Sequence, residues 1–262
     1  MRASGSREPP LMTIFAANWK MHHGPATGRD LVRAVLSRVR PREDRTLLFF
    51  PPAPTLPAVA AEVAGRRDAA AGVQNVHWEA KGAFTGELSV GIAGEAGATW
   101  VLVGHSERRH KFGETDEESG KKVRAVLVAS LNPMLCVGEK LEERKAGQTE
   151  AVVLRQLAAG LEGLDAVALA RVVIAYEPVW AIGTGVNATP QDAATVHRRI
   201  RGWLKARTPA GLRSRVLYGG SVSASNAAAL LAEEELDGVL VGGASLEVES
   251  WTAICETPRP AR

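Results

Sequence analysis

The chain has few of the features that mark secreted, membrane-bound or metal-binding proteins. It contains only two cysteines, Cys136 and Cys255, which supply neither a disulfide framework nor the paired spacing of a metal site. No apolar run approaches the roughly 20 residues that span a bilayer. The segment before Met12 lacks the apolar core of a secretory signal. These absences predict a cytoplasmic protein with no membrane partner.

Aromatic residues are also scarce, at 5% of the chain, and the charge is nearly balanced, with 32 basic and 29 acidic residues. The short basic group Arg198-Arg199-Ile200-Arg201 is typical of a solvated helix face, with nucleic-acid binding as the alternative. The six tryptophans and two tyrosines form no aromatic–basic pattern suited to nucleic acid. We therefore expect no nucleic-acid partner.

Length and hydrophobic pattern indicate one α/β domain. The 262 residues are close to the roughly 250 of a typical (β/α)8 barrel. Short apolar runs alternate with amphipathic stretches, which predicts parallel strands joined by helices, and about eight such units favour a closed barrel over an open doubly wound sheet. The expected strands are 13–17, 46–50, 69–73, 99–103, 134–137, 171–175, 215–218 and 238–241, and the clearest expected helices are 30–39, 116–129, 149–161 and 191–205.

The ends of the chain are predicted to lie outside this barrel. We expect residues 1–11 to be a disordered extension, residues 12–256 to form the barrel, and residues 257–262 to be a tail. Met12 directly precedes the first strand and is a candidate translation start. Within the barrel, Thr189 followed by Pro190 predicts the capped start of a helix.

The most informative segment is the run 175–185, which places a carboxylate at a strand end. The preceding residues are apolar enough for a strand buried on both faces, so Glu177 follows where that strand stops. Pro178 disfavours helix, and Gly183 and Gly185 allow unusual backbone angles, so the apolar segment between Pro178 and these glycines is predicted to move as a lid. The alternative is a simple strand-to-helix turn, which any α/β protein contains.

Polar groups also follow the first and fourth expected strands. Asn18 and Lys20 could donate a hydrogen bond and supply positive charge to a substrate anion, although a surface lysine is the alternative. His105 precedes a plausible helix start, where backbone amides disfavour the imidazolium, so a neutral ring could donate to a carbonyl oxygen. A structural histidine is the alternative for His105. Glu107 could serve chemistry or pair with Lys20, and pairing is favoured.

Two glycine pairs follow the last two expected strands, at Gly219-Gly220-Ser221 and Gly242-Gly243. In barrels these two loops frequently hold a phosphate, because glycine lets backbone amides approach an anion closely. Tight turns into outer helices are the alternative. Together the groups describe a small phosphorylated carbonyl substrate, a carboxylate base, a neutral donor and an ammonium group, with no cofactor or metal required.

In this combination the sequence resembles the triosephosphate isomerase family, from about Thr13 to about Cys255. The motifs that carry the resemblance occur in the family's order: Asn18-Trp19-Lys20-Met21, Val103-Gly104-His105-Ser106-Glu107-Arg108-Arg109, Cys136-Val137-Gly138-Glu139, Ala175-Tyr176-Glu177-Pro178-Val179-Trp180-Ala181-Ile182-Gly183-Thr184-Gly185, Tyr218-Gly219-Gly220-Ser221-Val222 and Gly242-Gly243-Ala244-Ser245-Leu246. The resemblance implies a TIM barrel that interconverts glycerone phosphate and D-glyceraldehyde 3-phosphate in glycolysis and gluconeogenesis.

The resemblance also implies roles for particular residues. Glu177 would be the base, His105 the electrophile, Asn18 and Lys20 substrate contacts, and Gly183, Ser221, Gly242 and Gly243 phosphate contacts. Ser106, Glu107 and Cys136 would support the site. The family is normally a homodimer, and Thr85, in the segment 74–87, would contact the partner's active site. This chain departs from most members at His22-His23, which we interpret as a surface loop and not as a metal site.

Two alternatives remain open at this point. A related isomerase of four-carbon sugar phosphates would use the same catalytic residues with a larger pocket. A phosphate-binding barrel without catalysis would serve as a sensor or scaffold, but the presence of Lys20, His105 and Glu177 together argues against it.

Overall fold

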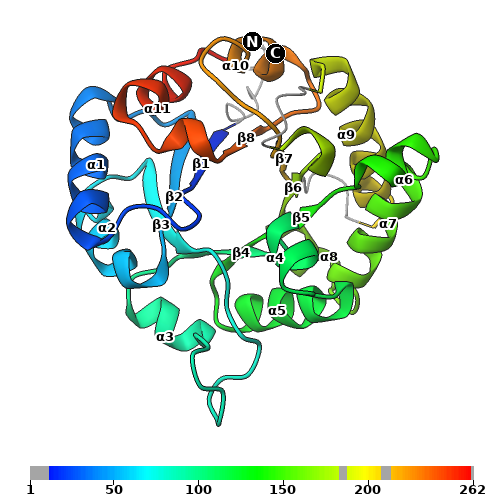
Figure 1. Cartoon of the computed structure of the whole chain (residues 1–262), viewed down its shortest axis with the longest axis horizontal. Helices are drawn as coiled ribbons and strands as arrows, with labels where there is room; N and C mark the ends of the chain where they lie inside the picture. The colour runs from blue at the N-terminus through cyan, green and yellow to red at the C-terminus, as the bar shows by residue number, and fades with distance from the viewer. Residues whose placement is uncertain (1–11, 183–187, 208–213, 261–262) are drawn as a thin grey trace, which may run out of the picture.

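The fold is a closed barrel of parallel strands surrounded by helices (Figure 1). A computed structural model describes residues 12–182, 188–207 and 214–260. Eight strands pair in sequence order, and the first pairs with both the second and the eighth, which closes the barrel. The predicted fold class is therefore confirmed.

The strands are β1 (Thr13–Asn18), β2 (Arg45–Phe50), β3 (Ala69–Val73), β4 (Trp100–Val103), β5 (Asn132–Val137), β6 (Val173–Tyr176), β7 (Val216–Tyr218) and β8 (Gly238–Val241). The helices are α1 (Pro25–Arg38), α2 (Leu56–Val63), α3 (Val90–Glu95), α4 (Ser106–Lys111), α5 (Asp116–Val128), α6 (Leu141–Lys145), α7 (Thr149–Gly160), α8 (Ala166–Arg171), α9 (Pro190–Lys205), α10 (Ala227–Ala232) and α11 (Val248–Cys255). Short 3-10 turns are η1 (Ala53–Thr55), η2 (Val179–Ala181) and η3 (Gly243–Ser245).

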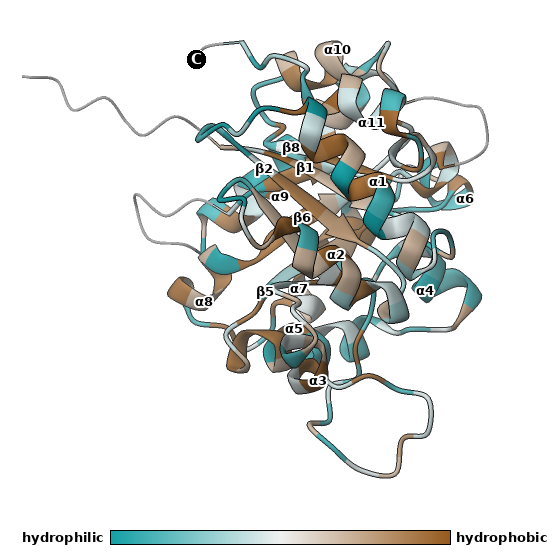
Figure 2. Ribbon diagram, turned by 90° about the vertical axis from the view of Figure 1, so that its left-hand side faces the viewer, coloured by the Kyte–Doolittle hydropathy of each residue, from teal (hydrophilic) through white to brown (hydrophobic). Residues whose placement is uncertain are grey.

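Alternating strand residues divide the core into two layers. Ile14 and Ala16 of β1 join a cluster made of strand residues, which fills the barrel interior. Phe15 and Ala17 join a larger cluster shared with the helices. Because the strands are covered on both faces, they read as continuous apolar runs, and Figure 2 shows them as hydrophobic ribbon inside a more polar exterior.

Capping residues and prolines in the sequence account for the starts of three helices. The Thr189 side chain accepts a hydrogen bond from the Asp192 amide at 3.1 Å, and Asp192 accepts from the Thr189 amide at 3.2 Å, which confirms the predicted start of α9. Helix α1 begins earlier than predicted because Pro25 occupies its first turn. Arg171 was predicted in a strand but ends α8, whose start is capped by Asp165.

The loops at the carboxyl ends of the strands differ in how far they extend from the barrel. The segment between β3 and α3 projects well beyond the helices in both views (Figures 1 and 2), and its residues 79–87 are exposed. No helix in the described part of the chain is both long and apolar enough to cross a membrane.

Candidate active site

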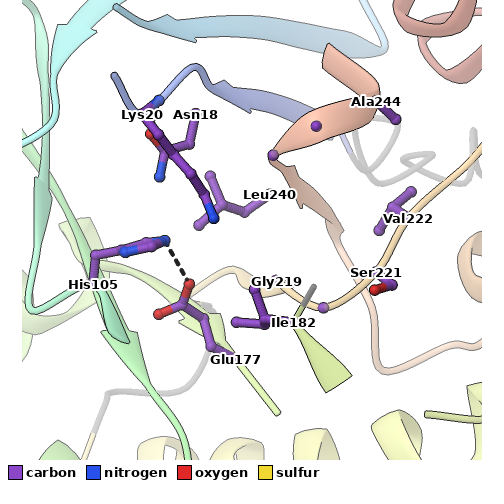
Figure 3. A pocket seen from close by; sticks show the side chains of 13 residues that line it. Asn18, Lys20, His105, Glu177, Ile182, Gly219, Ser221, Val222, Leu240 and Ala244 are labelled. Atoms are coloured by element: carbon purple, nitrogen blue, oxygen red, sulfur yellow. Dashed lines mark hydrogen bonds and ion pairs between the residues drawn. The ribbon is translucent and has the colours of Figure 1, made fainter. Parts of the chain in front are cut away.

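A pocket lies at the carboxyl ends of the strands, where the sequence predicts the chemistry of a barrel (Figure 3). It brings together polar groups from β1, β4 and β6 and the glycine loops after β7 and β8. Its lining residues are Asn18, Lys20, His105, Glu177, Ile182, Gly219, Gly220, Ser221, Val222, Leu240, Gly242, Gly243 and Ala244.

Glu177 follows β6 and is 2% exposed. One carboxylate oxygen lies 2.9 Å from Nε2 of His105, as Figure 3 shows, and the other accepts from the Ser106 amide at 2.8 Å. Burial raises the pKa of Glu177, but the adjacent His105 ring, the Ser106 amide and the positive charge of Lys20 together lower it by more, so its pKa lies below the ordinary value. The side chain is therefore a buried, ionised carboxylate.

His105 caps the amino end of α4, as its position in the sequence predicts. Its Nδ1 accepts a hydrogen bond from the Glu107 amide at 3.2 Å. An acceptor nitrogen carries no hydrogen, so this contact favours the neutral tautomer with the hydrogen on Nε2, which points to Glu177. Burial lowers the pKa of His105, whereas the adjacent Glu177 carboxylate raises it above the ordinary value in this arrangement.

Lys20 is held in a left-handed backbone conformation, with φ of 52°, by contacts on both sides. Its amide donates to Oδ1 of Asn18 at 3.0 Å, and its carbonyl accepts from the Gln74 side chain at 2.8 Å. Its Nζ lies 3.2 Å from Glu107, so the favoured pairing of Lys20 with Glu107 is present. Asn18 and Lys20 thus share one wall of the pocket (Figure 3).

Ser221 and Ala244 lie on the side of the pocket away from His105 (Figure 3), and Gly242 and Gly243, which directly precede Ala244 in the chain, also line the pocket. The Ser221 hydroxyl donates to the Ala181 carbonyl at 2.7 Å, which ties the loop after β7 to the segment after β6. Gly183, the remaining predicted phosphate contact, lies outside the described residues.

The predicted supporting residues surround Glu177 or lie on the projecting loop. Cys136 is fully buried beside Glu177, where desolvation and the neighbouring carboxylate raise the pKa of its thiol. The Cys136 carbonyl accepts from Arg109 at 3.2 Å, and Arg109 also donates to the Gly104 carbonyl at 2.7 Å. Gly104 has φ of 67°, which explains why glycine precedes His105. Thr85 is exposed and does not line this pocket.

The sequence predicted no role for Glu139, although the residue belongs to the family motif Cys136-Val137-Gly138-Glu139. Glu139 is fully buried, accepts from the Tyr176 hydroxyl at 3.1 Å and from the Trp180 indole at 2.9 Å, and lies 3.7 Å from Arg144. It therefore fixes the residues on either side of Glu177-Pro178. An acidic residue two positions after the apolar β5 run was the available signal.

Gly219 was predicted only as part of a phosphate loop, but its small size also leaves room for the Glu177 side chain. A Cβ atom on Gly219 would lie 2.9 Å from Cγ of Glu177, so only glycine leaves this side chain its space. Within the described ranges, no group of three or more His, Cys, Asp or Glu side chains is arranged to hold a metal ion.

Fold and pocket place the chain in the class of (β/α)8-barrel proteins that carry acid–base side chains at the carboxyl ends of the strands. The sequence model of the family described as triosephosphate isomerase matches residues 13–258. The chain belongs to the triosephosphate isomerase family, a family of isomerases that interconvert triose phosphates.

Curated relatives match over nearly their whole length. The triosephosphate isomerase of Herpetosiphon aurantiacus is 46% identical over 92% of this chain and 97% of the relative. That of Symbiobacterium thermophilum is 47% identical over 95% of this chain and 98% of the relative. That of Marinobacter nauticus is 47% identical over 93% of this chain and 96% of the relative.

Proposed function

We propose that this chain interconverts glycerone phosphate and D-glyceraldehyde 3-phosphate, a step of glycolysis and gluconeogenesis, with Glu177 as the base. The observation that carries the proposal is the meeting of the Glu177 carboxylate and the Nε2 of His105, 2.9 Å apart, in the pocket that Lys20 and the two glycine loops line. These groups match the needs of proton transfer next to a carbonyl.

In the proposed reaction, the Glu177 carboxylate turns from His105 and the Ser106 amide toward substrate. It removes the proton from C2 of glyceraldehyde 3-phosphate, and the electron pair forms a C1–C2 double bond as the C1 carbonyl becomes an enediolate oxygen. Nε2 of His105 then gives its proton to the oxygen on C1 and takes the proton of the C2 hydroxyl. The same carboxyl group returns a proton to C1 as the C2 oxygen becomes the carbonyl of glycerone phosphate. Protein groups perform each proton transfer, so the proposal invokes no cofactor or metal.

His105 and Lys20 stabilise the charge that develops on oxygen. When the Glu177 carboxylate turns away, the interaction that raises the pKa of His105 weakens, while the Glu107 amide still donates its hydrogen bond to Nδ1 of His105. The ring therefore meets the enediolate as a neutral donor through Nε2. The ammonium group of Lys20, near Asn18, adds fixed positive charge.

The phosphate group is proposed to bind at Ser221, Gly242 and Gly243, with Gly183 as a further contact inferred from the family motif. The glycine positions leave backbone amides accessible to an anion. Binding there leaves the carbonyl end of a three-carbon substrate at His105 and Glu177.

Chain length of the substrate tests this function against the four-carbon alternative. We expect kcat/KM to favour three-carbon over four-carbon phosphates by at least about 10-fold, because one extra hydroxymethyl group must fit against Ile182 and Leu240. Steady-state rates on both substrates provide the comparison. A reversed preference would favour the four-carbon isomerase, and binding of phosphate without turnover of either would favour the sensor.

We also propose that the active form is at least a dimer of this chain, located in the cytoplasm. Two exposed apolar residues favour burial against a second copy of the chain. Met21, next to Lys20, is 94% exposed, and Phe84, next to Thr85, is 43% exposed. The His77 ring stacks on Trp78, with ring centroids 4.2 Å apart, and packs at a tilt against Phe84, with centroids 4.3 Å apart, which gives the projecting loop a defined shape. Thr85 would then contact the partner subunit's Asn18 and Lys20.

Phe84→Asp is expected to raise the dissociation constant of the dimer by at least about 30-fold, because it puts a charge into an apolar interface. Turnover per chain should fall with the dimer fraction. Val167→Asp is the matched control, since Val167 is 65% exposed on α8, away from the projecting loop (Figure 2). Sedimentation velocity measures the dimer fraction of each variant, and kcat is measured at the same chain concentrations. A monomeric wild type with full activity would contradict the proposal.

A further inference from the structure

The loop between β1 and α1 contains a second residue in a left-handed conformation. His23 has φ of 62°, only three residues after Lys20. Residues other than glycine rarely adopt such angles, and they persist where surrounding contacts hold them. The sequence interpretation of His22-His23 as a surface loop fits exposed His22, whereas His23 is half-buried.

Three contacts hold His23 in place. Its Nε2 lies 3.1 Å from the carbonyl oxygen of Leu246, which is 223 residues away along the chain. The ring packs edge-on against Trp19, with centroids 5.2 Å apart. The Thr55 hydroxyl donates to the His23 carbonyl at 2.9 Å. Because a carbonyl oxygen only accepts, Nε2 of His23 must carry the hydrogen.

Leu246 belongs to the loop that forms the glycine-lined end of the pocket. Its amide donates to the Gly243 carbonyl at 3.1 Å and so closes η3. The Lys20 side chain lies close to this loop, because a Cβ on Gly242 would lie 3.4 Å from Cε of Lys20. The hydrogen bond from His23 thus connects the backbone that carries Lys20 to the backbone that carries Gly242 and Gly243.

We propose that His23 is a positioning residue for phosphate binding, which rests on the function proposed above. By donating to Leu246, its imidazole fixes the distance between Lys20 and the loop after β8. It does not line the pocket and acts only through these groups. Loss of the bond should weaken binding of the phosphate group while proton transfer at Glu177 proceeds.

The test compares three variants of the full chain. His23→Gly permits the left-handed backbone but removes the donor, His23→Gln restores an N–H donor of similar reach, and His22→Gly controls for added loop freedom. Readouts are KM and kcat with glyceraldehyde 3-phosphate, the competitive inhibition constant of inorganic phosphate, and the melting temperature.

We expect His23→Gly to raise KM and the phosphate inhibition constant by about 3- to 10-fold, the factor that one neutral hydrogen bond contributes. Its kcat should stay within about 2-fold of wild type. His23→Gln and His22→Gly should stay close to wild type in all three constants. If His23→Gly does not fold, His23→Asn replaces it, because Asn tolerates the left-handed backbone but is too short to reach Leu246.

The assignment is overturned if His23→Gly leaves KM and the phosphate inhibition constant unchanged, or lowers kcat alone. A His23→Gln variant as weak as His23→Gly would also overturn it, since the donor would then not be the active feature. Failure of the underlying function would appear in the wild type, as absent turnover, whereas failure of the His23 assignment would appear only in the variants.

Discussion

Glu177→Gln is expected to lower kcat by about 10²–10⁴-fold, the usual contribution of a positioned base, with a much smaller change in KM. The amide cannot take a proton from carbon, but it keeps the shape of the side chain, which is 2% exposed and tightly surrounded. Steady-state kinetics in both reaction directions, with the melting temperature as a check of folding, measure the effect.

Glu117→Gln is the matched control for this prediction, because it removes a carboxylate from an exposed helix face, where Glu117 pairs with Lys121. Its kcat should equal that of the wild type. If folded Glu177→Gln retained a kcat within a few-fold of wild type, Glu177 would not be the base.

Glu114→Gln is expected to lower the free energy of unfolding by about 3–5 kcal/mol at pH 7, the usual effect of breaking a buried ion pair. Glu114 is buried and accepts from Lys122 at 2.7 Å, from Arg108 at 3.1 Å and from the Gly104 amide at 3.1 Å. The substitution leaves buried Lys122 without its countercharge. Denaturant unfolding at a fixed protein concentration measures the difference.

The pH dependence of this difference has a defined sign. Burial raises the pKa of Glu114, but Lys122 and Arg108 lower it more, so the folded pKa lies below the ordinary value of 4.5. The ionised carboxylate therefore stabilises the fold above about pH 4.5, and this contribution is lost as pH falls through the folded pKa. The difference in free energy of unfolding between wild type and Glu114→Gln should become smaller below pH 4.5.

Exposed Glu117→Gln serves again as the control, with an expected loss below about 1 kcal/mol. A Glu114→Gln variant as stable as this control would show that the cluster around Lys122 contributes little. A gap that widened on acidification would contradict the direction given for the pKa of Glu114.

The barrel could be predicted from sequence because its strands are covered on both faces and read as apolar runs. Thr189-Pro190 likewise fixed the start of α9 through local contacts. The error at Arg171 arose because a β-branched run after it outweighed the capping signal of Asp165 six residues earlier. Boundaries depend on such competition between local signals.

The positions of Lys20, His105 and Glu177 at strand ends were also predictable, since barrels collect functional groups there. Their contacts were not. The 2.9 Å distance between His105 and Glu177 depends on the pairing of β5 with both β4 and β6. The hydrogen bond from His23 to Leu246 joins the first and last units of the barrel. No local pattern encodes a pairing between such distant segments.

Conversion of glyceraldehyde 3-phosphate by the wild-type protein in deuterium oxide, followed by NMR of the product, tests the central claim most directly. Proton transfer through Glu177 predicts deuterium at C1 of glycerone phosphate, because the protonated carboxyl group exchanges with solvent before it returns a proton. A control without protein measures background exchange. Rapid formation of glycerone phosphate with no deuterium at C1 would contradict proton transfer through a carboxyl group that exchanges with solvent.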